Sequence, residues 1–226
     1  MRLEGGRTRS ELVDLLIAEA ALDPDVVIGL DFAFSLPGWY LRERGLTAPA
    51  LWAALAAEGA GLGRWMSAPE FPFWSTAEQH ALLRPEQELR RTEKEVRGLG
   101  SRPKSVFQLV GAGQVGRGSL YGMQALHRLA AAGFRIWPFE PAGLPLVVEI
   151  FPRLLTGPVR KSRATERERY VADLPMTPAF RRLAGASEDA FDAAVSALAM
   201  SAAAEELSAL PREAEYALEG KIWYPS

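Results

Sequence analysis

The sequence contains no cysteine and only two histidines, His80 and His127, among its 226 residues. The absence of cysteine excludes disulfide scaffolds, thiolate metal sites, cysteine nucleophiles and redox-active thiol pairs. Two histidines are also too few for a histidine-rich zinc site. Any metal chemistry of this chain must therefore rely mainly on oxygen ligands.

The chain also lacks a strong excess of charge and any long apolar run. Its 26 Lys and Arg residues against 28 Asp and Glu residues give a formal net charge of -2, which excludes a broadly basic surface but not a local basic groove. No stretch reaches the ~18 consecutive apolar residues of a membrane span, and the N-terminus lacks the apolar core of a signal peptide. We therefore expect a cytoplasmic protein without a membrane partner. The sequence carries no signal for an oligomeric state.

Alternating helical and extended patterns predict an α/β fold with a largely parallel or mixed sheet flanked by helices, in a single domain over residues 1–226. Ser187 and either Thr8 or Ser10 are expected N-caps, and so is Ser119. The expected strands are Val26–Asp31, Val106–Val110, Phe134–Phe139 and Pro145–Phe151, and the expected helices span about 10–21, 119–132 and 187–207.

Residues 38–105 interrupt this alternation. Aromatic residues, prolines and glycines are scattered there with little periodicity, and short helices are expected only at 49–58 and 85–97. We interpret the segment as a long insertion over one face of the core, serving either as a lid or as a packing subdomain.

The run Gly111–Gly116 fits the G-x-G-x-x-G pattern of dinucleotide-binding folds, between an expected strand and an expected helix. It would support a nicotinamide-dependent oxidoreductase with Glu140 on the ribose of the cofactor. Two features count against this interpretation. The expected helix begins only at Ser119, after the motif, and Glu140 lies 29 positions beyond Gly111, more than the ~20 of the fingerprint. We favour a structural turn that brings the loop close to the sheet.

Three acidic residues occupy positions where a carboxylate is costly. Asp31 closes an apolar strand, Glu149 interrupts another, and Asp192 opens a helix that has no further charge until residue 205. A buried carboxylate needs a cation, hydrogen-bond donors or a metal. Taken singly, each has a structural explanation as a loop acid, an ion-pair member or an acid favoured by a helix dipole. Taken together, they predict a carboxylate cluster able to hold Mg²⁺ or Mn²⁺.

Residues 153–169 hold six basic residues and only two acidic ones. A basic segment beside an acidic cluster suits a phosphate-bearing substrate, because arginine and lysine contact phosphate oxygens. The alternative interpretation is a solvated charged loop.

A set of sequence runs extends over nearly the whole chain: Val27–Pro37, Gln108–Ser119, Val148–Pro152 and Phe191–Ala194, with Arg7–Arg9 and Glu219–Trp223 at the two ends. These runs resemble the domain-of-unknown-function 429 family. The resemblance implies a ribonuclease H-like fold and a nuclease activity. It implies that Asp31, Glu149 and Asp192 are the acidic positions of the family, and that Lys161 and Arg163 belong to a recurring basic stretch. The glycine loop is part of the family pattern, which further weakens the dinucleotide interpretation.

The chain departs from that family at its start. Ribonuclease H-like folds open with a hairpin whose first strand carries an essential aspartate, and this chain begins beyond the position of that strand. We expect either that an Asp-bearing strand is encoded upstream, with Met1 an internal methionine, or that the site has lost one carboxylate and the chain is inactive as written.

The leading hypothesis is therefore a divalent-metal-dependent nuclease in which Asp31, Glu149 and Asp192 hold Mg²⁺ or Mn²⁺ while Lys161 and Arg163 contact phosphate. The alternatives are a non-catalytic nucleic-acid or protein-binding module of the same fold and, less favoured, the oxidoreductase. The hypotheses differ in geometry. A nuclease requires the three acids to converge on one metal position, whereas in a binding module they diverge or pair with arginines.

Overall fold

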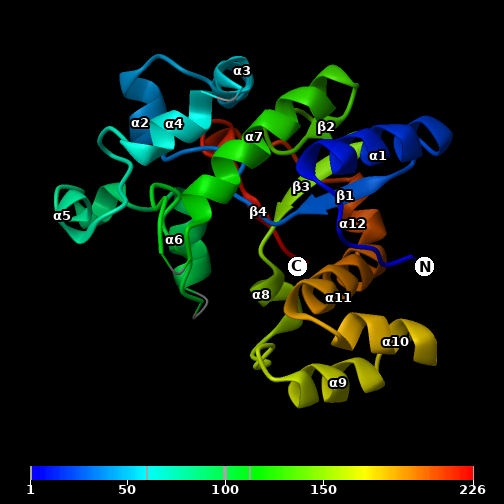
Figure 1. Cartoon of the computed structure of the whole chain (residues 1–226). Helices are drawn as coiled ribbons and strands as arrows, with labels where there is room; N and C mark the ends of the chain where they lie inside the picture. The colour runs from blue at the N-terminus through cyan, green and yellow to red at the C-terminus, as the bar shows by residue number, and fades with distance from the viewer. Residues whose placement is uncertain (1, 60, 99–100, 112, 226) are drawn as a thin grey trace.

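Four short strands form a parallel sheet at the centre of the molecule (Figure 1). The structure is a computed structural model that describes residues 2–59, 61–98, 101–111 and 113–225, so that Met1 and Ala112 lie outside the described residues. One edge of β3 (Leu146–Ile150) pairs with β1 (Val27–Leu30). The other edge pairs with β2 (Arg135–Ile136) at the start of β3 and with β4 (Ile222–Trp223) at its end. The mixed α/β architecture predicted from the sequence is confirmed.

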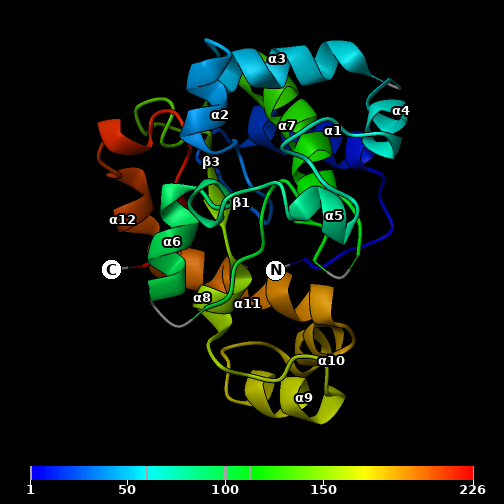
Figure 2. The same ribbon diagram turned by 90° about the vertical axis from the view of Figure 1, so that its left-hand side faces the viewer.

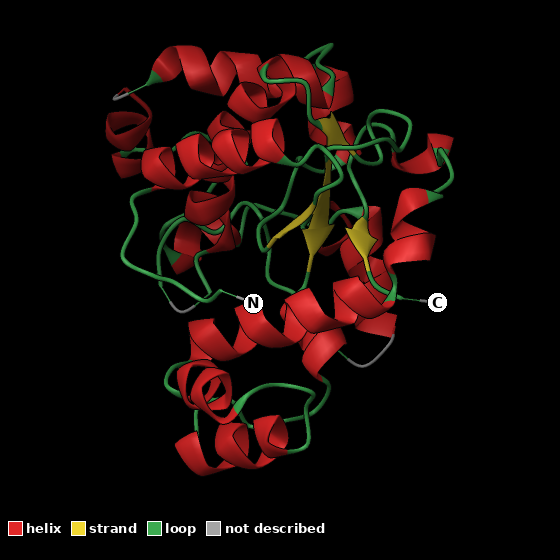
Figure 3. Cartoon of the chain, turned by 90° about the vertical axis from the view of Figure 1, so that its right-hand side faces the viewer, coloured by secondary structure: helices red, strands yellow, loops and turns green. Residues whose placement is uncertain are grey.

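Strand β3 is buried on both faces because its side chains alternate between two apolar cores. Val147 belongs to the core that contains residues of α1 (Arg9–Leu22) and α7 (Val115–Ala131). Val148 and Ile150 belong to the core that contains Met200 of α11 (Glu188–Ala202) and a leucine of α12 (Ala204–Ser208). Figure 3 shows the strands lying between these two groups of helices. Odd and even positions of β3 therefore face different helices.

The helices that flank the sheet begin where polar caps predict. Thr8 caps α1 and Ser187 caps α11, each hydroxyl accepting the backbone N–H of the residue three positions later. α8 (Pro152–Thr156) follows β3 and contacts α11. α9 (Ala164–Ala172) and α10 (Pro178–Gly185) pack beneath α11 around a third apolar cluster (Figure 2). Within the described part of the chain, no helix combines the length and apolarity needed to cross a membrane.

Residues 38–105 pack onto the core as a helical subdomain. Trp52 and Leu62 share the apolar core of α7, and the indole N–H of Trp52 donates to the carbonyl oxygen of Phe34 at 2.7 Å. The expected helix at 49–58 is confirmed as α3, whereas the one expected at 85–97 divides into a 3₁₀ turn (Pro85–Gln87) and α6. The helices of this segment are α2 (Gly38–Glu43), α3 (Ala48–Glu58), α4 (Gly61–Ser67), α5 (Ala77–His80) and α6 (Arg91–Gly98).

Two local predictions near the glycine loop are wrong. Val106–Val110 does not form a strand of the sheet and contributes only an isolated bridge between Gln108 and Trp74. The following helix begins at Val115, inside the glycine motif, and not at Ser119. Ser119 is buried in that helix, where its hydroxyl accepts the backbone N–H of Ala33 at 3.0 Å. The hydroxyl therefore connects α7 to the segment after β1 and does not cap a helix.

Two glycines in the first turn of α7 should respond to alanine in opposite ways. A Cβ on Gly116 would lie 2.3 Å from the carbonyl oxygen of Val106, whereas a Cβ on Gly118 would meet no atom within 4 Å. We expect Gly116→Ala to lower the free energy of unfolding by about 1–3 kcal/mol through overpacking. We expect Gly118→Ala to raise it by up to about 1 kcal/mol, because alanine has the higher helix propensity. Urea denaturation followed by circular dichroism measures both, and equal effects of the two substitutions would contradict the packing assigned to Gly116.

Candidate functional site

Asp31 and Asp192 lie near one another at the carboxyl end of β1. Asp31 follows the last residue of β1, and Asp192 lies one turn into α11, the helix that packs on that strand. Of the neighbouring charges, that of Asp192 has the largest effect on the pKa of Asp31. Side chains alternate between the two faces of a strand, so Asp31 is on the same face as Val27 and Gly29. That face is covered by α11. The sequence-predicted acids Asp31 and Asp192 are thus brought together.

The carboxylate of Asp192 is only half satisfied. Its Oδ2 accepts a hydrogen bond from the ammonium group of Lys161, while its Oδ1 is buried and has no hydrogen-bond partner among the described residues. The side chain of Asp192 is 12% exposed, against 36% for Lys161. An unpaired buried carboxylate oxygen is costly, so this atom is a natural ligand for a cation.

The environment of Asp31 disfavours its charged form. Loss of hydration, followed by the negative charges of Asp192, Glu149 and Asp189, raises the pKa of Asp31 to about 6, and Lys161 opposes the shift. The residue remains accessible to solvent, so its carboxylate lies at the edge of this acidic group. Loss of hydration also raises the pKa of Asp192, with Lys161 again opposing. Two neighbouring carboxylates of this kind favour a bound proton or a bound cation.

Glu149 does not join this pair, because it lies on the other face of the sheet. Glu149 lies two positions after Val147 on β3, so its side chain is on the same face of the sheet. That face is covered by α7 and not by α11. Glu149 is 2% exposed, and one oxygen of its carboxylate accepts the backbone N–H of Phe34 at 2.9 Å. A search of the described residues finds no group of three or more His, Cys, Asp or Glu arranged to hold a metal. The convergence of all three acids expected for a nuclease is not present in this structure.

Arg90 is the ion-pair partner of Glu149, and sequence reasoning did not identify it. Its guanidinium nitrogens lie 2.9 and 2.5 Å from the two carboxylate oxygens of Glu149 and 2.7 Å from Glu93, and a further N–H donates to the carbonyl oxygen of Glu219. Arg90 is 1% exposed. Burial raises the pKa of Glu149, and the facing Arg90 opposes the shift. The signal that could have found this pair is the strand alternation, which places Glu149 in a dry core where it needs a cation.

The predicted phosphate-binding residues lie in the loop between α8 and α9, but they differ in availability. Lys161 pairs with Asp192, as described above, whereas Arg163 is exposed at the N-cap position of α9. Arg160 is likewise exposed, and no ion pair to Arg160 or Arg163 occurs within the described ranges. Arg167 is buried and donates to the carbonyl oxygens of Lys161, Gly185 and Ala186, so it is structural.

The glycine loop has a packing role in this structure. Gly116 lies directly against the backbone carbonyl groups of Val106 and Gln108, which leaves no room for a cofactor on that side of the helix. The helix does open within the motif, as a dinucleotide site requires, but residues 106–110 supply no strand of the sheet before it. The arrangement therefore lacks the strand–turn–helix geometry that cradles a pyrophosphate.

Comparison of the chain with models of protein families, with curated proteins and with solved structures gave no match.

Replacing Arg90 should destabilise the fold strongly. Arg90→Met leaves Glu149 and Glu93 buried without a cation, and loss of one partner of a buried pair costs about 3–5 kcal/mol. The matched control is Arg169→Met, because Arg169 is 78% exposed and lies 3.8 Å from Glu166. We expect this control to change the free energy of unfolding by at most about 1 kcal/mol. Urea denaturation measures both, and a loss of less than about 1 kcal/mol in Arg90→Met would show that the pair is not a major constraint.

Asp31 should make stability depend on pH. Its pKa of about 6 in the folded state exceeds its ordinary value of 3.8, so the folded state binds this proton more tightly than the unfolded chain. Ionisation of Asp31 therefore lowers the free energy of unfolding as the pH rises from 3.8 to about 6, and the full loss of stability is present above that interval. We expect Asp31→Asn to have a higher urea midpoint than the wild type near pH 7.5, and this difference to narrow near pH 4.5.

The control for this experiment is Asp25→Asn, since Asp25 is exposed at the opposite end of β1. Its difference from the wild type should be small and nearly the same at both pH values. If Asp31→Asn behaved in the same way, the raised pKa of Asp31 would be disproved.

Proposed function

We propose that this protein is a divalent-metal-dependent phosphodiesterase acting on nucleic acid, with Asp31 and Asp192 as the metal ligands. The observation that carries the proposal is the buried, unpartnered Oδ1 of Asp192 beside the raised-pKa carboxylate of Asp31. Carboxylate oxygens are the ligands that Mg²⁺ and Mn²⁺ prefer. The pair lies at the carboxyl ends of parallel strands, where ligands bind in open α/β sheets.

The residues around the pair suit a phosphodiester. Lys161 donates to Oδ2 of Asp192, and Oδ1 is left without a hydrogen-bond partner among the described residues. Arg160 and Arg163 are exposed on the same loop and supply charge for neighbouring phosphates. The resemblance to a ribonuclease H-like family supports the same chemistry. Under this proposal Glu149 is a positioning residue, because its two oxygens already accept hydrogen bonds from Arg90 and Phe34.

The reaction is hydrolysis of a phosphate ester. Asp31 and Asp192 would hold the divalent cation, which would lower the pKa of a water molecule and neutralise charge on the phosphoryl oxygens. The new bond forms between the water oxygen and phosphorus, the bond from phosphorus to the ester oxygen breaks, and a proton passes to the leaving oxygen. Asp31 and Asp192 hold the reacting groups in place, and Lys161 lowers the charge repulsion between substrate and acids.

Binding of Mn²⁺ measured by calorimetry tests the metal site. We expect the wild type to bind Mn²⁺, and Asp31→Asn and Asp192→Asn to lose at least about tenfold in affinity, the loss that corresponds to one charged ligand contact. Asp25→Asn should bind as the wild type does, since it removes an equal charge at the far end of β1. Equal affinity in Asp192→Asn and the wild type would overturn the assignment.

Cleavage of end-labelled single-stranded DNA and RNA in the presence of Mn²⁺ tests the activity. We expect Asp192→Asn to cleave at least about 100-fold more slowly than the wild type, as loss of one charge-stabilising group in an active site does.

The second candidate function is a non-catalytic nucleic-acid-binding module. Glu149 is ion-paired with Arg90, as this alternative expects of the predicted acids. Binding of either oligonucleotide without Mn²⁺-dependent cleavage would favour the module over the enzyme.

A further inference from the structure

A hollow lies between α5, α6 and the segment 101–108, and its lining residues include neither Asp31 nor Asp192. Its volume is about 590 Å³, within the range of small-molecule sites. Trp74 and His80 line it together, with ring centroids 4.4 Å apart and an angle of 31° between their planes. His80 Nε2 lies 3.4 Å from the carboxylate of Glu88, which also lines the hollow. The wall thus presents two neighbouring aromatic rings held in a defined orientation.

The backbone around this hollow is held by hydrogen bonds. The N–H of Trp74 donates to the carbonyl oxygen of Phe107 at 3.0 Å, and the N–H of Leu109 donates to the carbonyl oxygen of Trp74 at 2.9 Å. The hydroxyl of Ser105 donates to the carbonyl oxygen of Glu88 at 2.9 Å. These bonds join three segments of the chain, so the aromatic wall is preorganised and little ordering is needed on binding.

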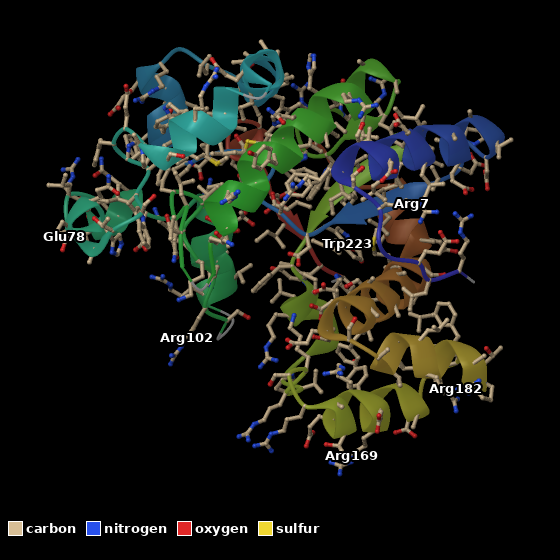
Figure 4. All side chains as sticks on the ribbon, in the orientation of Figure 1. Arg7, Glu78, Arg102, Arg169, Arg182 and Trp223 are labelled. Atoms are coloured by element: carbon tan, nitrogen blue, oxygen red, sulfur yellow. The ribbon has the colours of Figure 1, made fainter. Side chains whose placement is uncertain are left out.

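The rim of the hollow is positively charged. Arg97, Arg102 and Lys104 all line it and are exposed, and no ion pair to any of them occurs within residues 2–59, 61–98, 101–111 and 113–225. Figure 4 shows Arg102 extending outward from the fold. Glu88 is the one acid among the lining residues, and its carboxylate already faces His80. Three cations without carboxylate partners favour an anionic ligand.

We propose that this hollow binds a nucleotide, with its base against the Trp74–His80 pair and its phosphate at Arg102 and Lys104. Aromatic rings stack on the faces of bases, and arginine and lysine contact phosphate oxygens. The same chemistry is offered by a free nucleotide and by one unit of a nucleic-acid strand. This site shares no residue with the acid pair and does not depend on the proposed phosphodiesterase activity.

Calorimetric titration of the full chain without divalent cations tests the proposal. The probes are adenosine 5′-monophosphate, adenosine, inorganic phosphate and a six-residue oligodeoxyadenylate. We expect adenosine 5′-monophosphate to bind at least about tenfold more tightly than adenosine or phosphate, because only the nucleotide uses both halves of the site. A free-nucleotide site binds the mononucleotide as tightly as the oligonucleotide, whereas a strand-binding site binds the oligonucleotide more tightly.

Three variants separate the two halves of the site. The double substitution Arg102→Gln and Lys104→Gln should weaken binding of the mononucleotide at least about tenfold, since it removes two charged contacts. The Trp74→Leu substitution removes the aromatic ring and should reduce the ratio of the affinity for the nucleotide to the affinity for phosphate. Arg182→Gln is the control, because Arg182 is exposed on the opposite side of the view from Arg102 (Figure 4).

Failure of both the mononucleotide and the oligonucleotide to bind would overturn the proposal, as would unchanged affinity in the Arg102 and Lys104 double variant. Repeating the titration with Asp192→Asn keeps the two sites distinct. Nucleotide binding that is unchanged by Asp192→Asn is assigned to the hollow. The result of the nucleotide titration does not change how Mn²⁺ binding at Asp192 is interpreted.

Discussion

The buried ion pair between Arg90 and Glu149 is the constraint on which the arrangement of this protein depends. A charge can be removed from water only where a partner and hydrogen bonds replace its hydration. Arg90 meets this condition by contacting Glu149 of β3, Glu93 of α6 and the backbone of Glu219 together. The pair therefore joins the central strand, the helical subdomain and the C-terminal segment. For this reason Arg90 and Glu93 of the helical subdomain form part of the buried core next to β3.

The same pair also decides which acids can act together. Because Glu149 pairs with Arg90 on the α7 face of β3, one of the three predicted carboxylates is absent from the face that α11 covers. Asp31 and Asp192 remain there, with Lys161 as their nearest cation. Two carboxylates with one nearby lysine retain excess negative charge, and this excess is the physical reason for proposing a cation site there. Strand β3 thus separates Glu149 from Asp31 and Asp192, although the residue types alone would group the three acids together.

Charge in this protein is organised locally, although its total is close to neutral. The acid pair and the exposed arginines of the α8–α9 loop lie on one part of the surface, and the cations around Trp74 lie on another. Exposed charges of either sign act over a Debye length of about 8 Å at physiological ionic strength. Each region therefore presents its own potential to a ligand, and both suit a phosphate-bearing one.

The sequence by itself determined the elements whose signals are local. The cap at Ser187, the apolar strands β1 and β3, and the α/β alternation all follow from residues adjacent in the chain, because helix capping and strand burial depend on near neighbours. Only the tertiary structure decided that Ser119 lies inside a helix, that Gly116 packs against a neighbouring backbone, and that Arg90 reaches Glu149 across 59 positions. The pairing of Asp31 with Asp192 falls between these cases. Residue type and position predicted both acids, but strand parity and the packing of α11 decided that they meet and that Glu149 does not.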